Sequence, residues 1–279
     1  MVNRIYHTLL VLLPSAILVS CQTKSIALVD SFRMSATEYE HLERRAADGD
    51  AEAAWHLLIH HELGTGNKKA AELWLRRAAV LKLPKAQSDL ASRIKEDSFS
   101  PTGFGPNPRE AVRSLLERAA QTEGDACNEL ASAYAEGYFG SSDHSKARIY
   151  FCQGANLHNR ACWEELSRYY RHGQGGPRDD GEAYYWISLE TRCVDPRSVS
   201  GEKSWETREE IASHLSLSEM EREWRRIDAF LSRVAAKEVV IDDYPFLSGA
   251  ISEKSEVEGR RLSQQREDEH RKKWRSSNT

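Results

Sequence analysis

The sequence predicts an all-α fold, an αα-hairpin repeat solenoid with C-terminal capping helices. Alanine, leucine, glutamate and arginine dominate the 279 residues and runs of β-branched residues are scarce, which favours helices over strands. Hydrophobic residues make up 40% of the chain, enough for a sizeable core. A residue pattern also recurs along the chain, and its leucines are separated by steps of 33, 40 and 36 residues. A period of this length is typical of stacked helical hairpins.

The first 20 residues are expected to be an export signal rather than part of the fold. Arg4 gives a positive start, and the apolar stretch 9–19 is too short to cross about 30 Å of hydrocarbon. The sequence Leu18-Val19-Ser20-Cys21 then resembles a bacterial lipobox, in which the cysteine is lipidated and becomes the mature N-terminus. An ordinary signal peptide with a chance cysteine is the alternative. Gln22 in place of Asp favours the outer membrane, so we expect a periplasm-facing protein with a lipid anchor on Cys21.

Residues 21–40 are expected to form a linker and residues 41–193 four helical hairpins. Spacings of three and four residues place the residues that define the repeat on one face of each first helix. The third hairpin has this pattern in its first helix at Ala126, Leu130, Tyr134 and Gly137. The second helix carries an alanine and, three residues later, an aromatic residue that fills the groove between the two helices. Because one hairpin cannot bury its apolar face alone, neighbouring hairpins must stack.

The hairpin turns contain the residue types that helix ends require. Gly64, Gly137 and Gly173 are expected to end the first helices, where a left-handed conformation is common. Asp143 and Asp179 are expected to begin the second helices. The second hairpin departs from the pattern, because its insert 98–108 contains three prolines and two glycines. We expect this hairpin to be distorted or looped out.

These repeats resemble the Sel-one-like repeats (SLR), relatives of the tetratricopeptide repeats. The segments 130–137 and 146–151 match their pattern closely, as do the segments 166–176 and 182–186. The resemblance covers roughly residues 43–230. It implies a solenoid that binds another protein. The motifs are specific for the fold and say little about the partner.

The C-terminal third is expected to close the solenoid. Residues 204–214 continue as a helix, and Ser218 and Glu221 have the spacing of a capping box that opens another helix, running to about Ala236. Capping helices and an apolar packed segment therefore occupy residues 194–251. The tail 252–279 has eight basic and six acidic residues from Glu253 onward and few apolar ones. It forms either a solvated helix or a disordered segment, and its composition favours partial disorder.

Four cysteines remain after Cys21, and an exported chain meets an oxidising periplasm. In an antiparallel hairpin the start of the first helix faces the end of the second. This geometry predicts the disulfides Cys127–Cys152 and Cys162–Cys193, one in each of two hairpins. Four buried free thiols are the alternative.

The sequence contains no convincing catalytic, cofactor or metal motif. His56 and His60 stand one turn apart but have no obvious third ligand, and His61 occupies a groove position of the repeat. No CxxC pair, phosphate-binding glycine loop or G-x-S-x-G motif is present. A net charge of −4 gives no general attraction to nucleic acid. We therefore expect no enzyme, no cofactor, no metal ion and no nucleic-acid partner.

Stacked hairpins offer a concave surface that suits a protein partner. The first-helix positions between the packing residues should line it, and these are His56, Asp89, Glu129, Trp163, Glu165, Arg168 and His172. An exposed Trp or Arg would be the strongest anchor of such a surface. The alternative for Trp163 is that it fills the groove between helices.

Two functions fit a lipid-anchored binding module. One is an adaptor, scaffold or regulator of an envelope or cell-wall complex. The other is an immunity protein that binds and occludes a secreted toxin. The resemblance favours the second, because SLR lipoproteins are among the immunity proteins that protect bacteria from type VI secreted effectors, including phospholipases. The partner expected here is therefore a secreted effector enzyme, phospholipase-like in kind.

Overall fold

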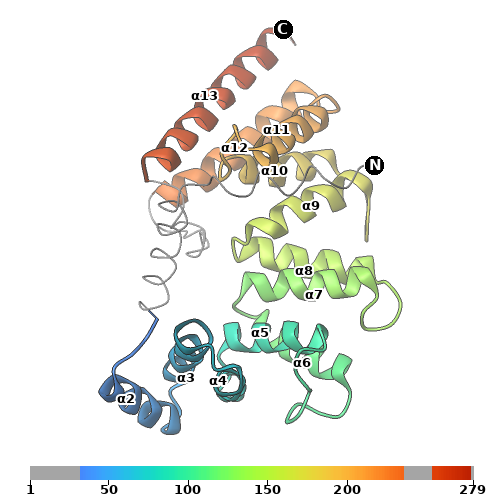
Figure 1. The fold of residues 1–279 in the computed structure, drawn as a ribbon. Helices are drawn as coiled ribbons and strands as arrows, with labels where there is room; N and C mark the ends of the chain where they lie inside the picture. Colours follow the sequence, from blue (N-terminus) through green and yellow to red (C-terminus); the bar gives the residue numbers. More distant parts are fainter. Residues whose placement is uncertain (1–31, 236–252, 278–279) are drawn as a thin grey trace, which may run out of the picture. The chain divides into compact units, whose positions relative to one another are not determined.

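The computed structural model describes residues 32–235 and 253–277, in which every regular element is a helix (Figure 1). This confirms the predicted helical fold class. The expected export signal, Cys21 and the apolar segment 239–251 lie outside the described residues. The chain divides into two compact units, the first ending at Leu90 and the second beginning at Ala91.

The first unit contains α2 (Ala36–Ala47), α3 (Ala51–Ile59), the π-helix η1 (His60–Thr65), α4 (Lys68–Val80) and the first half of α5 (Pro84–Lys95). α2 packs on α3, and α3 packs on α4 to form a hairpin. Ser35, Asp50 and Asn67 precede these helices, and the side chain of each accepts a hydrogen bond from a backbone N–H of the first turn. α2 begins within the segment expected to be a linker.

The turn between α3 and α4 differs from the expected one. Gly66 holds the left-handed conformation, with φ of 68°, and Gly64 does not. Gly64 instead allows a close approach, since a Cβ there would lie 2.7 Å from the carbonyl oxygen of Phe32. The π-helical turn η1 lengthens the end of the first helix, so the left-handed glycine lies two residues later than the spacing of the other hairpins predicts.

The second unit contains six helices after α5 that extend the hairpin series. They are α6 (Pro108–Ala119), α7 (Gly124–Glu136), α8 (His144–Asn156), α9 (Arg160–His172), α10 (Asp180–Thr191) and α11 (Val199–Ala212). α7 pairs with α8 and α9 with α10, while α8 packs on α9 and α10 on α11, so successive hairpins stack. Small residues and leucines fill the core, and Leu115, Leu130 and Leu166 are fully buried. α6 is regular despite the insert before it, because Asn107 caps its start and Pro108 occupies its first turn.

The helix ends predicted for the third and fourth hairpins are confirmed. Gly137 and Gly173 end α7 and α9 in the left-handed conformation, with φ of 74° and 65°. Asp143 and Asp179 begin α8 and α10, each accepting a hydrogen bond from the backbone N–H three residues on. These local signals therefore set the turns of the third and fourth hairpins.

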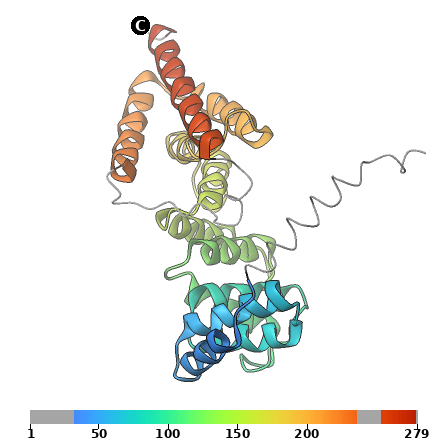
Figure 2. The same cartoon turned by 60° about the vertical axis from the view of Figure 1, so that its left-hand side comes forward.

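Two further helices complete the second unit, α12 (Leu217–Ala235) and α13 (Glu253–Ser277) (Figure 2). α12 packs on α10. Its capping box lies two residues before the expected one, because Glu219 accepts hydrogen bonds from the backbone N–H and hydroxyl of Ser216 at 2.8 and 2.6 Å. The charged tail forms α13, a helix of 25 residues, and not the disordered segment that its composition favours.

Candidate functional site

The predicted partner-binding positions of the first unit lie on α3 and α5. His56 is exposed on α3, and Asp89 is half-buried on α5. Near His56, Lys85 pairs with Glu52 at 2.8 Å, and its ammonium lies 5.1 Å from the centre of the Trp55 ring. The first helices of this unit therefore present charged side chains whose positions are fixed by their neighbours.

In the second unit, Glu165, Arg168 and His172 project from one face of α9. Glu165 is half-buried and the other two are exposed. Arg168 forms an ion pair with Glu165, donates to the side-chain oxygen of Gln174 at 2.7 Å and covers the Tyr169 ring with its guanidinium 5.0 Å from the ring centre. The guanidinium is thus held in one orientation while part of it stays open to a partner.

The corresponding face of α7 is acidic and is linked to α5. Glu129 accepts a hydrogen bond from the Ser92 hydroxyl at 2.6 Å, and Glu136 pairs with Lys95 at 3.2 Å. Glu136 keeps 62% of its side chain exposed. Together, α7 and α9 bring Glu129, Glu165, Arg168 and His172 to the exposed faces of two successive first helices.

Trp163 does not belong to this surface. Its side chain is fully buried, its indole N–H donates to the carbonyl oxygen of Ala155 at 3.1 Å, and its ring meets Phe230 edge-on at 5.8 Å. The expected anchor is therefore a groove filler between α8, α9 and α12. Burial of the indole satisfies both its apolar ring and its single donor, so nothing of it remains for a partner.

None of the four cysteines of the described residues is in a disulfide, so the expected pairs Cys127–Cys152 and Cys162–Cys193 are not formed. Cys127 on α7 and Cys162 on α9 both pack against Gly154 on α8, where an added Cβ would lie 2.9 Å from the Cβ of Cys127 and 2.4 Å from Sγ of Cys162. Stacking between hairpins, and not contact within one hairpin, therefore sets their neighbours. Burial raises the pKa of Cys127 to about 12 and also raises the pKa values of Cys152 and Cys162.

His60 and His61 of the first unit are used for packing. Nδ1 of His60 lies 3.1 Å from the carbonyl oxygen of Phe32, and Nε2 of His61 lies 3.1 Å from the Tyr39 hydroxyl. His60 is buried and His61 half-buried, whereas the repeat pattern placed His61 in the core. Across residues 32–235 and 253–277, no group of three or more His, Cys, Asp or Glu side chains is placed to hold a metal ion.

Comparison with solved structures relates this arrangement to a known fold. The chain aligns with a protective antigen of uropathogenic Escherichia coli that displays an SLR fold, with a TM-score of 0.57, 17% identity and 74% of this chain covered.

The chain has the SLR fold.

The alignment spans 44% of the antigen, so this chain matches less than half of that protein. A Sel1 repeat protein from Oxalobacter formigenes also aligns, with a TM-score of 0.39, 24% identity, and coverage of 46% of this chain and 92% of that one. No protein-family model and no curated protein matches the sequence. In the part of the chain that the structure describes, no helix is both long and apolar enough to cross a membrane.

After the SLR hairpins, a polar docking site holds α13, and the sequence pattern did not predict this site. Arg208 on α11 is 1% exposed and pairs at 2.5 Å with Glu267 on α13, whose side chain is 3% exposed. Arg208 also donates to the hydroxyls of Ser188 and Tyr184 at 2.8 and 2.6 Å. A buried charge without such partners would be strongly unfavourable, so α13 completes the environment of Arg208.

A second set of contacts fixes the C-terminal half of α13. Arg271 donates two hydrogen bonds of 2.8 Å to the Asp228 carboxylate on α12 and one of 2.6 Å to Glu267. Burial favours the protonated form of Glu267, but the charges of Arg208 and Arg271 outweigh it and lower the pKa of the carboxyl. Glu267 therefore stays ionised between two arginines.

The buried side chains of α13 are polar, so the pattern of apolar residues in the sequence did not predict that this helix docks. Among the α13 residues with described side chains, the buried ones are Gly259, Ser263, Glu267 and His270. Their spacings of four, four and three are helical, but none of the four is an aliphatic or aromatic hydrocarbon side chain. A search for hydrophobic periodicity therefore finds no buried face in this helix.

Proposed function

We propose that the chain is a protein-binding module that holds its partner on the exposed faces of its first helices. The observation that carries this proposal is the α7–α9 face, where Glu129, Glu165, Arg168 and His172 stand on successive stacked hairpins. Ion pairs and ring contacts fix these side chains before binding, which reduces the entropy that association loses. The SLR fold supports the same conclusion, because hairpin stacks expose extended surfaces of this kind.

We further propose that this module is a periplasm-facing lipoprotein that binds and occludes a secreted effector, phospholipase-like in kind. The support is the lipobox-like Leu18-Val19-Ser20-Cys21 together with the SLR fold. A toxin that attacks lipid from the periplasm has to be met in that compartment, and a lipid on Cys21 keeps the inhibitor close to the threatened membrane. Occlusion requires a tight complex, so inhibition should titrate at one inhibitor per enzyme.

The first test uses a purified secreted phospholipase from a bacterium that carries this gene. Arg168→Glu should weaken its binding by about 2 kcal/mol or more, roughly 30-fold, in a titration calorimeter. Arg118→Glu is the matched control, because Arg118 is exposed on α6 and donates only to Ser114 within its own helix. Equal losses in the two variants would mean that overall charge, and not the α7–α9 face, drives binding.

The second test is made in cells. Deleting the gene should make a strain that carries the effector sensitive to its siblings, and a Cys21→Ser copy that remains unlipidated should restore protection only in part. A deletion strain that competes normally would contradict the immunity proposal.

A second candidate function is an adaptor for an envelope complex. It is favoured by Leu73 and Val80, which are 63% and 56% exposed and lie seven residues apart on α4. This apolar strip is in the first unit and offers a surface other than the α7–α9 face. An adaptor would bind two proteins at once, and Leu73→Asp would release one of them while Arg168→Glu would release the other.

A further inference from the structure

Aromatic rings of the second unit gather at the turn between α7 and α8, and cations lie over them. Tyr134 and Tyr150 stack with their ring centres 5.6 Å apart, and the ring of Phe139 meets that of Tyr134 edge-on at 5.0 Å. Tyr138 meets Phe139 edge-on at 5.3 Å and extends the cluster toward α6. The cations over these rings are Lys95, Arg109, Arg113 and Lys146.

The lysines and the arginines of this cluster differ in their partners. Lys95 pairs with Glu136 at 3.2 Å, and Lys146 pairs with Asp143 at 3.3 Å. Neither arginine has a carboxylate partner among the residues that the structure describes. The cluster therefore keeps two guanidinium groups that its own acidic residues do not neutralise.

Arg109 and Arg113 lie one turn apart on α6 and reach two adjacent rings. The guanidinium carbon of Arg109 lies 5.9 Å from the centre of the Tyr138 ring, and that of Arg113 lies 4.8 Å from the centre of the Phe139 ring. Because the two rings are in contact, the two guanidinium groups are neighbours on one aromatic surface. Arg109 is exposed and the other three residues are half-buried, so a partner can reach them. We call these four residues the arginine patch.

Both arginines of the patch are placed unfavourably for the isolated chain. Nε of Arg113 is buried without a hydrogen-bond partner, and its Nη2 donates a long hydrogen bond of 3.4 Å to the carbonyl oxygen of Phe139. Arg109 follows Pro108 in the first turn of α6, where the helix dipole disfavours a cation. Buried donors without acceptors are rare in folded proteins, so this arrangement points to an acceptor supplied from outside.

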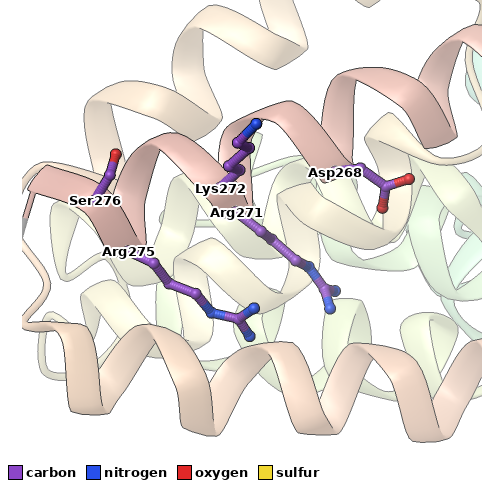
Figure 3. Close-up of a pocket in the computed structure, with 5 residues that line it drawn as sticks. All are labelled: Asp268, Arg271, Lys272, Arg275 and Ser276. Carbon is purple, nitrogen blue, oxygen red and sulfur yellow. The ribbon is translucent and has the colours of Figure 1, made fainter.

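The cations at the C-terminal end of α13 are arranged differently (Figure 3). Arg271 and Arg275 extend from one edge of that helix, while Lys272 stands on the other. Arg271 also donates hydrogen bonds to Asp228 and Glu267, so it holds the helix in place. The α13 cations thus point apart or are already paired, whereas the two arginines of α6 converge and lack a carboxylate.

We propose that the arginine patch binds an acidic segment of another protein through side-chain carboxylates. Each guanidinium fork can donate two parallel hydrogen bonds to one carboxylate, and the rings hold the forks in position. Arginine, tyrosine and phenylalanine are also the residue types that are enriched in protein interfaces. Glu110 and Glu117 are exposed on the same helix, so a long uniform polyanion such as a nucleic acid is disfavoured. The patch is separate from the α7–α9 face and does not depend on the function proposed for it.

The test titrates the full chain, made as Cys21→Ser to prevent lipidation, with a heptapeptide of alternating glycine and glutamate. Salt is kept low and constant, because it screens exposed charges. In nuclear magnetic resonance spectra, the Nε–H signals of Arg109 and Arg113 should shift and saturate as peptide is added. A peptide with glutamine in place of glutamate should leave both signals unchanged. In Arg109→Gln/Arg113→Gln, the backbone signals of Tyr138 and Phe139 should report binding at least tenfold weaker.

Arg118→Gln is the matched control, because Arg118 is exposed on the same helix and donates only to Ser114. It should change the affinity less than twofold, whereas Arg113→Gln should weaken binding at least fivefold. Circular dichroism checks the fold, and Arg109→Gln, at an exposed position, keeps the test decisive if Arg113→Gln unfolds the protein.

Three results would overturn the proposal. They are equal binding of the glutamate and glutamine peptides, an equal loss in Arg118→Gln and Arg113→Gln, and tighter binding of oligothymidine than of the acidic peptide. None of these variants alters the α7–α9 face, so failure here would leave the proposed effector binding untouched.

Discussion

At the scale of single residues, the second unit depends on charges buried away from water. Arg208 and Glu267 are paired across two helices that are far apart in sequence, and Arg208 depends on Glu267 for its counter-charge, whereas Glu267 is also paired with Arg271. A pair of this kind adds little net stability over well-packed apolar side chains, but breaking it leaves one charge buried and uncompensated. The pair therefore specifies where α13 binds more than how firmly the unit folds.

Removing one partner should show this asymmetry. Glu267→Gln should lower the free energy of unfolding by about 3 kcal/mol, because it leaves Arg208 without its carboxylate, as measured by urea denaturation. Arg208→Met/Glu267→Met should recover most of the loss. A double variant as unstable as the single one would show that packing, and not the lost charge, is responsible.

Glu190 predicts a dependence of stability on pH. It is 6% exposed, and burial raises the pKa of its carboxyl to about 7. The folded protein therefore keeps its proton between about pH 4.5 and 7 whereas the unfolded chain releases it, so stability falls as pH rises through this window. Glu190→Gln should remove that part of the slope and raise the free energy of unfolding at pH 8 by roughly 1–3 kcal/mol. A slope unchanged in Glu190→Gln would contradict this assignment.

At the scale of elements, the hairpin stack depends on one helical glycine. Gly154 lies where α8 meets α7 and α9, and its missing Cβ makes room for Cys127 and Cys162. In an ordinary helix interior, alanine would be more stable than glycine by about 1 kcal/mol. Here the contacts at 2.4 and 2.9 Å should reverse the sign, because real Cβ atoms do not approach so closely.

Gly154→Ala should therefore destabilise the protein by about 1–3 kcal/mol in thermal or urea unfolding. Adding Cys162→Ala removes the sulfur atom nearest to the new methyl group and should return part of the loss. Equal stability of the parent and Gly154→Ala would mean that α8 shifts freely against its neighbours.

The sequence predicted the hairpins and the third and fourth turns because their signals are local. Gly137, Gly173, Asp143 and Asp179 act within a few residues of where they stand. The site was predicted only in part. Glu165, Arg168 and His172 lie on the surface as spacing indicates, but Trp163 is covered by Phe230 from α12, a contact that no repeat pattern contains. The neighbours of the cysteines were not predicted for the same reason. Gly154 brings together thiols of different hairpins, and no repeat pattern contains that contact.

At the scale of the whole molecule, a repeat protein gains its stability mainly from neighbouring hairpins. The chain passes from the first compact unit to the second between Leu90 and Ala91, and each unit has buried leucines of its own. A destabilising substitution in one unit should therefore promote unfolding mainly of that unit.

Hydrogen exchange should detect this separation. Leu57→Ala, at a fully buried position of α3, should speed amide exchange in α2, α3 and α4 and leave α9 and α10 near the parent rates. Leu166→Ala, at the equivalent buried position of α9, should have the converse effect. Uniform acceleration along the chain in both variants would show that the molecule unfolds as one cooperative body.

The polar docking face of α13 has a consequence for how the protein behaves when that helix is released. The buried face of α13 consists of Gly259, Ser263, Glu267 and His270. The released helix therefore has no apolar stripe through which it could aggregate with other chains. Detachment would expose a charged, hydrophilic helix and the docking surface that it covered, which contains Arg208 and aromatic side chains. Because the contact depends on the ionised Glu267 carboxyl, acid should loosen it by protonating that group, and the protein should stay soluble after the change.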